Sequence, residues 1–195
     1  MEIQIHDEPL SHLADHGLIA GAFTVDRVLD LTVEEGGLGG FRLRERPLTE
    51  SYVKDYDMVV GNRPEDWRRQ FDLSSWGLIS ARIAGQRVGG VVIAAKSREL
   101  HLLEGRDDLA LLWDIRVAPS VRRRGIGATL FAAAERWAGG RGCLQLKVET
   151  QNTNVAACKF YASRGCELGA VQRFAYPDFP AEIQLLWYKV LGNRE

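Results

Sequence analysis

The sequence predicts an α/β (α+β) protein in which a mixed central β-sheet is flanked by helices and carries an N-terminal strand extension. Its second half alternates short apolar strands with two helical segments, and its first half holds residues with period two, which is typical of strands. The 195 residues, 46% hydrophobic and 26% charged, suit a soluble globular protein. We therefore expect one domain over residues 1–195 with a sizeable core.

The first half of the chain predicts strands and few helices. Residues 1–20 show no clear period, and we expect their three histidines to lie at the surface. The expected elements are a strand over 23–33, a flexible glycine connection over 36–40, a strand over 41–45 that stops at Pro47, a helix that begins at Pro64, and a hairpin of strands 78–83 and 88–95 around Gly85-Gln86.

The second half predicts a regular alternation of strands and helices. The elements expected there are a strand over 109–117 that Pro119 ends, a helix over 126–137, a strand over 144–149, a helix over 154–164 that Gly165 ends, and strands near 166–175 and 183–190. On the first helix, Ile126, Leu130, Ala134 and Trp137 form one apolar stripe. The stripe indicates that this helix packs against the sheet.

Composition excludes several classes of protein. A formal net charge of −1 argues against general nucleic-acid binding, which usually needs a basic face. Cys143, Cys158 and Cys166 lack the spacing of zinc ligands or of a disulfide framework, so we expect buried thiols and no metal. No segment resembles a signal peptide or a membrane span, and we expect a cytoplasmic protein.

A local cluster of positive charge precedes the first helix. Arg122, Arg123 and Arg124 stand directly before the sequence Gly125-Ile126-Gly127. The first turn of a helix offers unpaired N–H groups and the positive end of the helix dipole, and glycine leaves the backbone open to a ligand. The cluster favours an anion site of the kind that binds phosphates. A plain solvated helix start with a glycine turn is the alternative, because it would give the same sequence pattern. Position 130 is leucine and no Gly-Lys-Ser/Thr follows, so neither the dinucleotide fingerprint nor a P-loop is present.

Two motifs resemble one family. The segment WDIRVAPSVRRRGIGATLF, residues 113–131, is similar to the acetyl-CoA-binding motif of the GNAT (GCN5-related) N-acetyltransferases. The segment NTNVAACKFYASRGCELGA, residues 152–170, resembles the second motif of that family. Within the family, VETQNTNVAACKFY and EIQLLWYK are most similar to the streptothricin acetyltransferase group. The resemblance covers residues 75–190 as an acetyl-CoA-binding core, whereas residues 1–70 are divergent.

The resemblance implies a GNAT fold and acetyl-CoA as co-substrate. Main-chain groups at Ile115 and Val117 would pair with the pantetheine arm, the N–H groups of residues 123–129 would hold the pyrophosphate, and Asn154 would touch the pantetheine. The full set of expected co-substrate-binding residues is Ile115, Arg116, Val117, Arg122, Arg123, Arg124, Gly125, Ile126, Gly127, Ala128, Thr129, Asn154, Ala157 and Phe160.

The resemblance also implies catalytic roles. Tyr161 would be the general acid that protonates the leaving thiolate, which a phenol with a pKa near 10 can do. Glu149 would be the base, directly or through water, and Asp114 is the second choice. Each has a structural alternative. Tyr161 could pack its helix on the sheet, Glu149 could pair with Lys147 or Arg116, and Asp114 could be a buried carboxylate with Arg116 as its partner.

The acceptor is expected to be a small-molecule primary amine that carries positive charge, such as a cationic antibiotic. The 173–182 loop, with Phe174, Tyr176, Asp178, Phe179 and Glu182, would give aromatic walls and acids for it. A protein or peptide N-terminal acetyltransferase and a non-enzymatic acyl-CoA-binding module are the alternatives. No nucleic-acid or membrane partner is expected, and a homodimer is left open.

Overall fold

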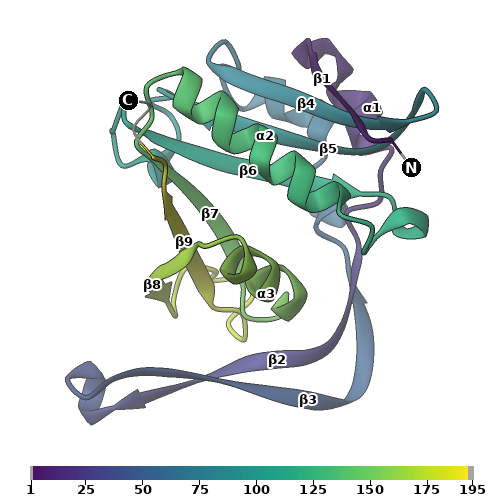
Figure 1. Ribbon diagram of the computed structural model, residues 1–195. Coiled ribbons are helices and arrows are strands. Elements are labelled where there is room, and N and C mark those ends of the chain that lie inside the picture. Colours follow the sequence, from purple (N-terminus) through teal and green to yellow (C-terminus); the bar gives the residue numbers. More distant parts are fainter. Residues whose placement is uncertain (1, 193–195) are drawn as a thin grey trace. The chain divides into compact units, whose positions relative to one another are not determined.

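The computed structural model describes residues 2–192 and divides into two compact units (Figure 1). The first comprises the chain up to Gly21, Asp55–Val148 and the residues from Tyr188 on, and the second comprises Ala22–Lys54 and Glu149–Trp187. Seven strands form a sheet in the order β1-β4-β5-β6-β7-β9-β8, and β2 and β3 form a separate two-stranded ribbon. Strands β6 and β7 are parallel while β1, β4, β5 and β6 pair antiparallel, so the predicted mixed sheet is confirmed.

The first unit contains most of the sheet and the longest helix. Its elements are β1 (Gln4–Glu8), α1 (Leu13–Gly17), β4 (Trp76–Ile83), β5 (Gln86–Ala95), β6 (Leu109–Val117), α2 (Ile126–Gly140), the start of β7 (Gln145–Gln151) and the end of β9 (Gln184–Val190). Short 3₁₀ turns include η3 (Tyr56–Met58), η4 (Pro64–Arg69), η5 (His101–Leu103) and η6 (Pro119–Val121). In the second unit lie β2 (Phe23–Glu34), β3 (Gly40–Lys54), α3 (Val155–Ser163), β8 (Glu167–Gln172) and the remainder of β7 and β9.

Helix α2 packs on one face of the sheet in the first unit (Figure 1). Its predicted stripe is buried at Ile126, Leu130 and Ala134. Two glycines allow the close approach, because a Cβ at Gly77 would lie 2.2 Å from Trp137 Nε1 and a Cβ at Gly89 would lie 2.9 Å from Leu130 Cδ1. The helix continues to Gly140, past the expected end, and the chain turns at Gly142 with φ +81°.

A hydrophobic core cluster lies on the face of the sheet opposite to α2. Leu13 of α1 and Trp67 of η4 pack with Trp76, and the rings of Trp67, Trp76 and Trp113 lie 5.1–6.4 Å apart. The apolar residues of the strands complete this cluster: Leu78, Val92, Ala94, Leu109 and Leu111. Several large aromatic side chains are therefore buried together on this face of the sheet.

Strand β6 contains one extra residue. Val92 of β5 pairs with Asp114, but the next residue, Ile93, pairs with Leu112, so Trp113 is a β-bulge. The extra residue inverts the alternation of side chains along the strand. Trp113 and Asp114 therefore do not take the opposite faces that adjacent strand residues normally take.

Two expectations for the first half need correction. The strand that should stop at Pro47 continues to Lys54, because Pro47 pairs with Arg27 where the register of the β2–β3 ribbon shifts, and a ribbon strand has a free edge that tolerates a missing N–H. The β4–β5 hairpin is confirmed, with Ala84 and Gly85 at positive φ as its two-residue turn. The helix start expected at Pro64 is the short 3₁₀ segment η4.

The histidines were predicted to be exposed, and this is wrong for His16, which is 0% exposed. His6 and His12 are exposed, and the three cysteines are buried free thiols. Within residues 2–192, no helix has the length and apolar character to cross a bilayer, and no cluster of His, Cys, Asp and Glu is arranged to hold a metal.

Candidate functional site

The arginine-rich loop between β6 and α2 has an unusual backbone. Arg123 has φ +64° and Gly125 has φ +85°, so two of three consecutive residues are left-handed. The side chain of Arg122 turns back and donates from Nε to the Val117 carbonyl at 3.0 Å, which ties the loop to the end of β6. Side chains of Arg122, Arg123 and Arg124 are exposed, so their positive charge faces solvent.

Helix α2 begins directly after this loop, with Gly125 as its N-cap and no side-chain cap. The Gly125 carbonyl accepts the Thr129 N–H at 3.0 Å and the Thr129 hydroxyl at 3.2 Å. A Cβ placed at Gly125 would meet nothing within 4 Å, so the space beside the first turn is open. Uncapped N–H groups, the helix dipole and open space fit an oxyanion such as the diphosphate of acetyl-CoA.

The end of β6 presents main-chain groups along a free edge. The Ala118 N–H bonds to the Val88 carbonyl, and the antiparallel alternation then directs the main-chain groups of Ile115 and Val117 away from β5. On the other side, the ladder between β6 and β7 ends at the pair Leu112–Val148. Ile115 and Val117 therefore have the orientation that the addition of an extended ligand requires.

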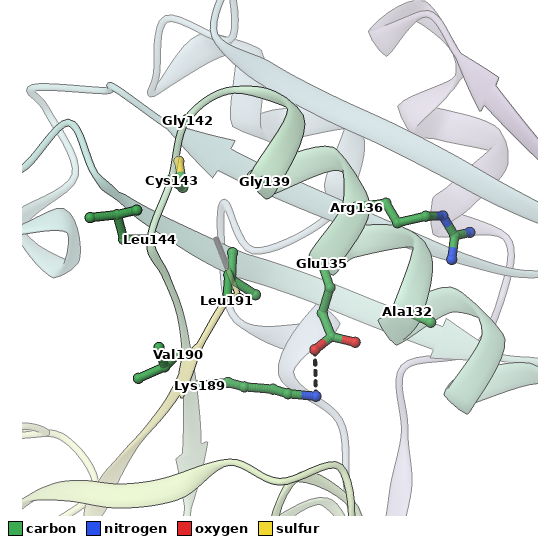
Figure 2. Close-up of a pocket in the computed structure, with 11 residues that line it drawn as sticks. Ala132, Glu135, Arg136, Gly139, Gly142, Cys143, Leu144, Lys189, Val190 and Leu191 are labelled. Atoms are coloured by element: carbon green, nitrogen blue, oxygen red, sulfur yellow. Dashed lines mark ion pairs between the residues drawn. The ribbon is translucent and has the colours of Figure 1, made fainter. Parts of the chain in front are cut away.

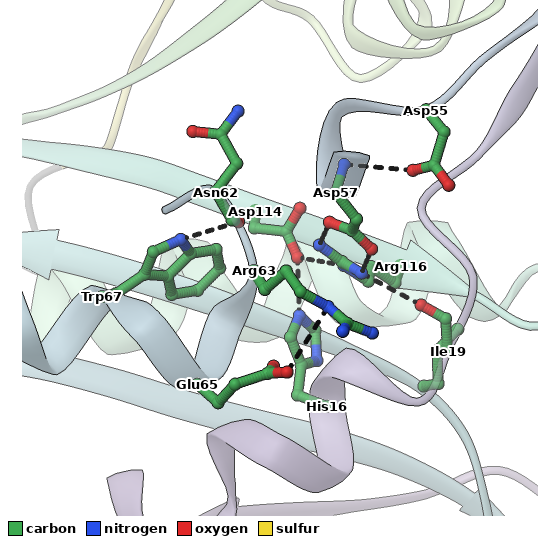
Figure 3. A network of polar contacts seen from close by, with 10 residues as sticks. All are labelled: His16, Ile19, Asp55, Asp57, Asn62, Arg63, Glu65, Trp67, Asp114 and Arg116. Carbon is green, nitrogen blue, oxygen red and sulfur yellow. Dashed lines mark hydrogen bonds and ion pairs between the residues drawn. The ribbon is translucent and has the colours of Figure 1, made fainter. Parts of the chain in front are cut away.

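Asp114 and Arg116 belong to a buried polar network that ties β6 to two N-terminal segments (Figure 3). His16 Nε2 donates to Asp114 Oδ2 at 2.6 Å, and Arg116 Nε donates to the same oxygen at 2.7 Å. The Arg116 guanidinium also binds both oxygens of Asp57 at 2.6 and 2.8 Å and the Ile19 carbonyl at 3.1 Å. The predicted Asp114–Arg116 contact is present, whereas His16 and Asp57 are partners that the sequence did not indicate.

These contacts limit the roles that Asp114 and Arg116 can have in catalysis and in co-substrate binding. Burial alone would raise the pKa of Asp114, but the hydrogen bonds and charges of His16 and Arg116 hold it below its ordinary value. A carboxylate whose charged form is stabilised by a neighbouring guanidinium is a poor base. The Arg116 side chain is only 4% exposed and is fully engaged. We therefore withdraw the catalytic role of Asp114 and the co-substrate role of the Arg116 side chain.

The second motif forms α3, whose N-cap is Asn154. The Asn154 side chain accepts the Ala157 N–H at 3.1 Å, which is a structural use of the amide oxygen. Cys158 and Tyr161 are buried on the helix, and Phe160 packs edge-on against Tyr161 with ring centroids 5.2 Å apart. Cys158 and Tyr161 are three residues apart on the helix, so both lie on its inward face.

Glu149 has neither of the ion-pair partners that were considered for it. Lys147 instead lies buried and binds the Leu102 carbonyl at 2.5 Å and the carboxylate of Glu104. Glu149 Oε1 accepts the hydroxyl of Tyr176 and, at 3.2 Å, the side-chain amide of Gln151. This carboxylate is therefore held by neutral donors and carries no cation of its own among the described residues.

The 173–182 loop differs from the expected acidic surface. Glu182 is 6% exposed and pairs with Lys54, whose ammonium group lies 4.1 Å from the ring centroid of Phe179. Glu182 is therefore already neutralised, and Phe179 already stacks on a cation. Phe174 and Asp178 are exposed.

A pocket of about 690 Å³ lies beside the C-terminal half of α2, with the Glu135–Lys189 ion pair at its wall (Figure 2). It also contains Cys143 and the exposed side chains of Leu144 and Val190. None of the predicted site residues lines this pocket. We therefore place the candidate site at the opposite, N-terminal end of α2 and at the free edge of β6.

A mixed sheet whose bulged strand leads into an arginine-rich, glycine-containing helix start defines an acyl-CoA-dependent transferase fold. The family model described as "Acetyltransferase (GNAT) family" matches residues 43–166, so the chain belongs to this family. The family match begins at residue 43, whereas the two motifs predict an acetyl-CoA-binding core that begins at residue 75. Acetyl-CoA is the co-substrate of the family, in agreement with the predicted co-substrate.

Curated relatives agree with the predicted subgroup. Streptothricin acetyltransferase A of Bacillus subtilis is 41% identical over 81 residues, which are 40% of this chain and 47% of the relative. Streptothricin acetyltransferase of Escherichia coli is 35% identical over 46% of this chain and 53% of its own length. Aminoglycoside N(6')-acetyltransferase type 1 of Klebsiella aerogenes is 41% identical over 51% of this chain and 65% of its length. The matched region thus spans about half the length of the two streptothricin relatives.

Solved structures confirm the fold. Nourseothricin acetyltransferase superposes with a TM-score of 0.77 at 22% identity and covers 98% of this chain and all of the other. A structure described as a putative streptothricin acetyltransferase from Bacillus anthracis, in complex with acetyl coenzyme A, has a TM-score of 0.74 at 25% identity and covers 97% of this chain and 99% of the other.

Proposed function

We propose that the protein is an acetyl-CoA-dependent N-acetyltransferase that moves the acetyl group directly to a primary amine of a small cationic molecule. The helix start after β6 carries this proposal. It combines the two left-handed residues Arg123 and Gly125, an uncapped helix of 15 residues and three exposed arginines. Such a start suits a diphosphate, and the free edge at Ile115 and Val117 suits the extended pantetheine arm.

The chemistry requires one bond to form and one to break. The amine nitrogen forms a bond to the thioester carbonyl carbon, and the carbon–sulfur bond breaks, which releases the thiolate of CoA. In our proposal Glu149 accepts the proton that the ammonium group loses to become a neutral amine, and Tyr161 gives its phenolic proton to the thiolate. The second proton, which the nitrogen loses as the amide forms, restores the Tyr161 phenol. Alignment of the two reactants supplies a large share of the rate.

The proposed acceptor class rests on chemistry and on the relatives. The Glu149 carboxylate has no internal cation in the described chain, so it can attract a substrate ammonium group. The streptothricin and aminoglycoside acetyltransferases among the relatives are named for cationic antibiotics. We propose streptothricin as the first acceptor to test, with an aminoglycoside second.

The test of the co-substrate site is calorimetry with CoA. Gly125→Val should weaken CoA binding by at least tenfold, because a branched side chain disfavours φ +85° and fills the open space at the helix start. Gly142→Val is the matched control, since Gly142 also has positive φ and open surroundings but lies beyond the other end of α2. Equal CoA affinity in wild type and Gly125→Val would refute the assignment.

The test of the activity is a turnover screen with acetyl-CoA and single amines. Streptothricin, an aminoglycoside, a polyamine and a peptide with a free N-terminus cover the competing classes. Turnover of small cationic amines supports the proposal, whereas turnover of the peptide alone would favour an N-terminal acetyltransferase. CoA binding without acetylation of any amine would favour a non-enzymatic acyl-CoA-binding module.

A further inference from the structure

The two donors of Glu149 bind the same oxygen. Tyr176 donates its hydroxyl proton to Oε1, and Gln151 donates from Nε2 to Oε1 at 3.2 Å. Gln151 Nε2 also lies 2.9 Å from the Tyr176 hydroxyl oxygen, so the three side chains form a closed ring of hydrogen bonds. Among the described residues, no hydrogen bond reaches Oε2 of Glu149. The second oxygen is therefore available to another group.

The ring is assembled from distant parts of the sequence. Glu149 and Gln151 are two residues apart on β7, so their side chains lie on one face of the strand. Tyr176 comes from the loop that follows β8, 27 residues further along the chain. Such a contact holds a carboxyl group that otherwise rotates freely on a long side chain, because the phenol and the amide together fix one of its oxygens.

Tyr176 remains a hydrogen-bond donor over the working pH range. Burial, and then the charge and hydrogen bond of Glu149, raise the pKa of Tyr176 far above its ordinary value. The phenol therefore keeps its proton and is ill suited to protonate a leaving thiolate. This separates Tyr176 from Tyr161, to which the proposed function gives that role.

We propose that Tyr176 is a positioning residue for acetyl transfer: with Gln151 it binds Oε1 of Glu149 and so presents Oε2 to the acceptor amine. The inference rests on the proposed function of Glu149 as the base. The proton of the substrate ammonium group passes to Oε2, which leaves a neutral amine and a carboxylic acid, and the acid then returns the proton to water. Tyr176 touches neither acceptor nor acetyl-CoA and acts only through Glu149.

A double-mutant cycle tests this inference, with streptothricin as the first acceptor and otherwise the best amine of the screen. Tyr176→Phe should lower kcat by about 10- to 100-fold, since misplacement of a catalytic group by about 1 Å has an effect of that size. The KM for acetyl-CoA should change less than twofold. Glu149→Gln should lower kcat at least as much, and the double variant should be no slower than Glu149→Gln alone.

Two further variants guard against a trivial loss of folding. Gln151→Met keeps the volume but removes one donor, and it should give a smaller loss of kcat that also disappears in the Glu149→Gln background. Tyr188→Phe removes another phenol that donates to a glutamate, the 3.1 Å contact with Glu104, and should leave kcat unchanged. Thermal unfolding midpoints of all variants are compared with that of the wild type.

The outcomes separate this inference from the proposed function. Additive losses in the Tyr176→Phe and Glu149→Gln double variant, or a change confined to the KM of the amine, would show that Tyr176 acts independently of Glu149 and overturn the inference alone. If the wild type binds CoA but acetylates no amine, the proposed function fails and the inference fails with it.

Discussion

His16 and Asp114 are 98 residues apart in the sequence, yet His16 Nε2 lies 2.6 Å from Asp114 Oδ2 in the buried network of the first unit. The contact joins α1, a helix of only five residues, to the strand that presents Ile115 and Val117. A helix so short has little stability of its own, so its position depends on tertiary contacts of this kind.

We expect His16→Phe to lower the free energy of unfolding by about 3 kcal/mol, because it removes a fully buried donor from the partly buried carboxylate of Asp114. Urea unfolding at pH 7 measures the loss. His12→Phe is the control, since His12 is exposed and its contact with Asp15 lies at the surface. A loss of similar size in both variants would contradict the importance assigned to the buried contact.

Acid should weaken the wild type through Asp114. Its pKa is lower in the folded protein than the ordinary value of 3.8, so the unfolded chain binds the proton more tightly. The stability that Asp114 contributes is therefore complete above about pH 4 and is lost as the pH falls through the folded pKa. Asp114→Asn should be less stable at pH 7 and should show a shallower decline below pH 4. An unchanged slope in urea unfolding from pH 5 to 2.5 would contradict this.

Gly90 lies against the other side of His16. A Cβ at Gly90 would lie 2.5 Å from His16 Nδ1, so Gly90→Ala must displace the imidazole and should cost about 1–3 kcal/mol of stability. Gly140→Ala should instead increase stability, because Gly140 ends α2 with open surroundings and without a positive φ. That variant should gain a few tenths of a kcal/mol up to about 1 kcal/mol. Thermal unfolding of both variants provides the comparison.

Tyr161→Phe should lower kcat by about 10²-fold or more while the affinity for acetyl-CoA stays within twofold, since a general acid acts only in the chemical step. Steady-state kinetics and calorimetry give the two quantities, and the exposed Tyr52→Phe is a control for the loss of a phenol. Unchanged turnover over the whole pH range would exclude Tyr161 as the acid.

The exposed arginines should act on CoA through charge. Replacement of Arg123 and Arg124 by Gln should weaken CoA binding and flatten its dependence on salt, because exposed charges are screened within about 10 Å at 0.1 M salt. Arg122→Gln should also release the loop from the Val117 carbonyl. It should therefore weaken CoA binding more than the replacement of Arg123 and Arg124 does. Equal salt dependence in wild type and the double variant would show that the arginines do not contact the phosphates.

The sequence allowed the regular parts of the fold to be predicted. Strand β6 and the start of α2 were placed at their observed first residues, because apolar runs bounded by proline and glycine give strong local signals. The end of β3 was misplaced because the register shift that accommodates Pro47 depends on the partner strand. Such pairings leave no local trace in either strand.

The candidate site was predictable in part. The helix start was found from local residues alone, and Asp114 signalled that a buried carboxylate needs a partner. His16 as that partner was not predictable, since its segment lacks periodicity and the contact is tertiary. Tyr176 could be placed in the acceptor loop, but its bond to Glu149 depends on how that loop folds back along β7.

The bulge at Trp113 lets β6 place two neighbouring side chains on one face. Loss of that single residue would join Leu112 directly to Asp114 in a regular ladder with β5, and the pairs on both sides would keep their present faces. The aromatic cluster would lose one ring, whereas Asp114 and Arg116 would still face their partners. A one-residue insertion or deletion elsewhere in β6 would instead exchange the faces of the residues that follow it. Among related chains, a change of length in this strand should therefore occur at the bulge.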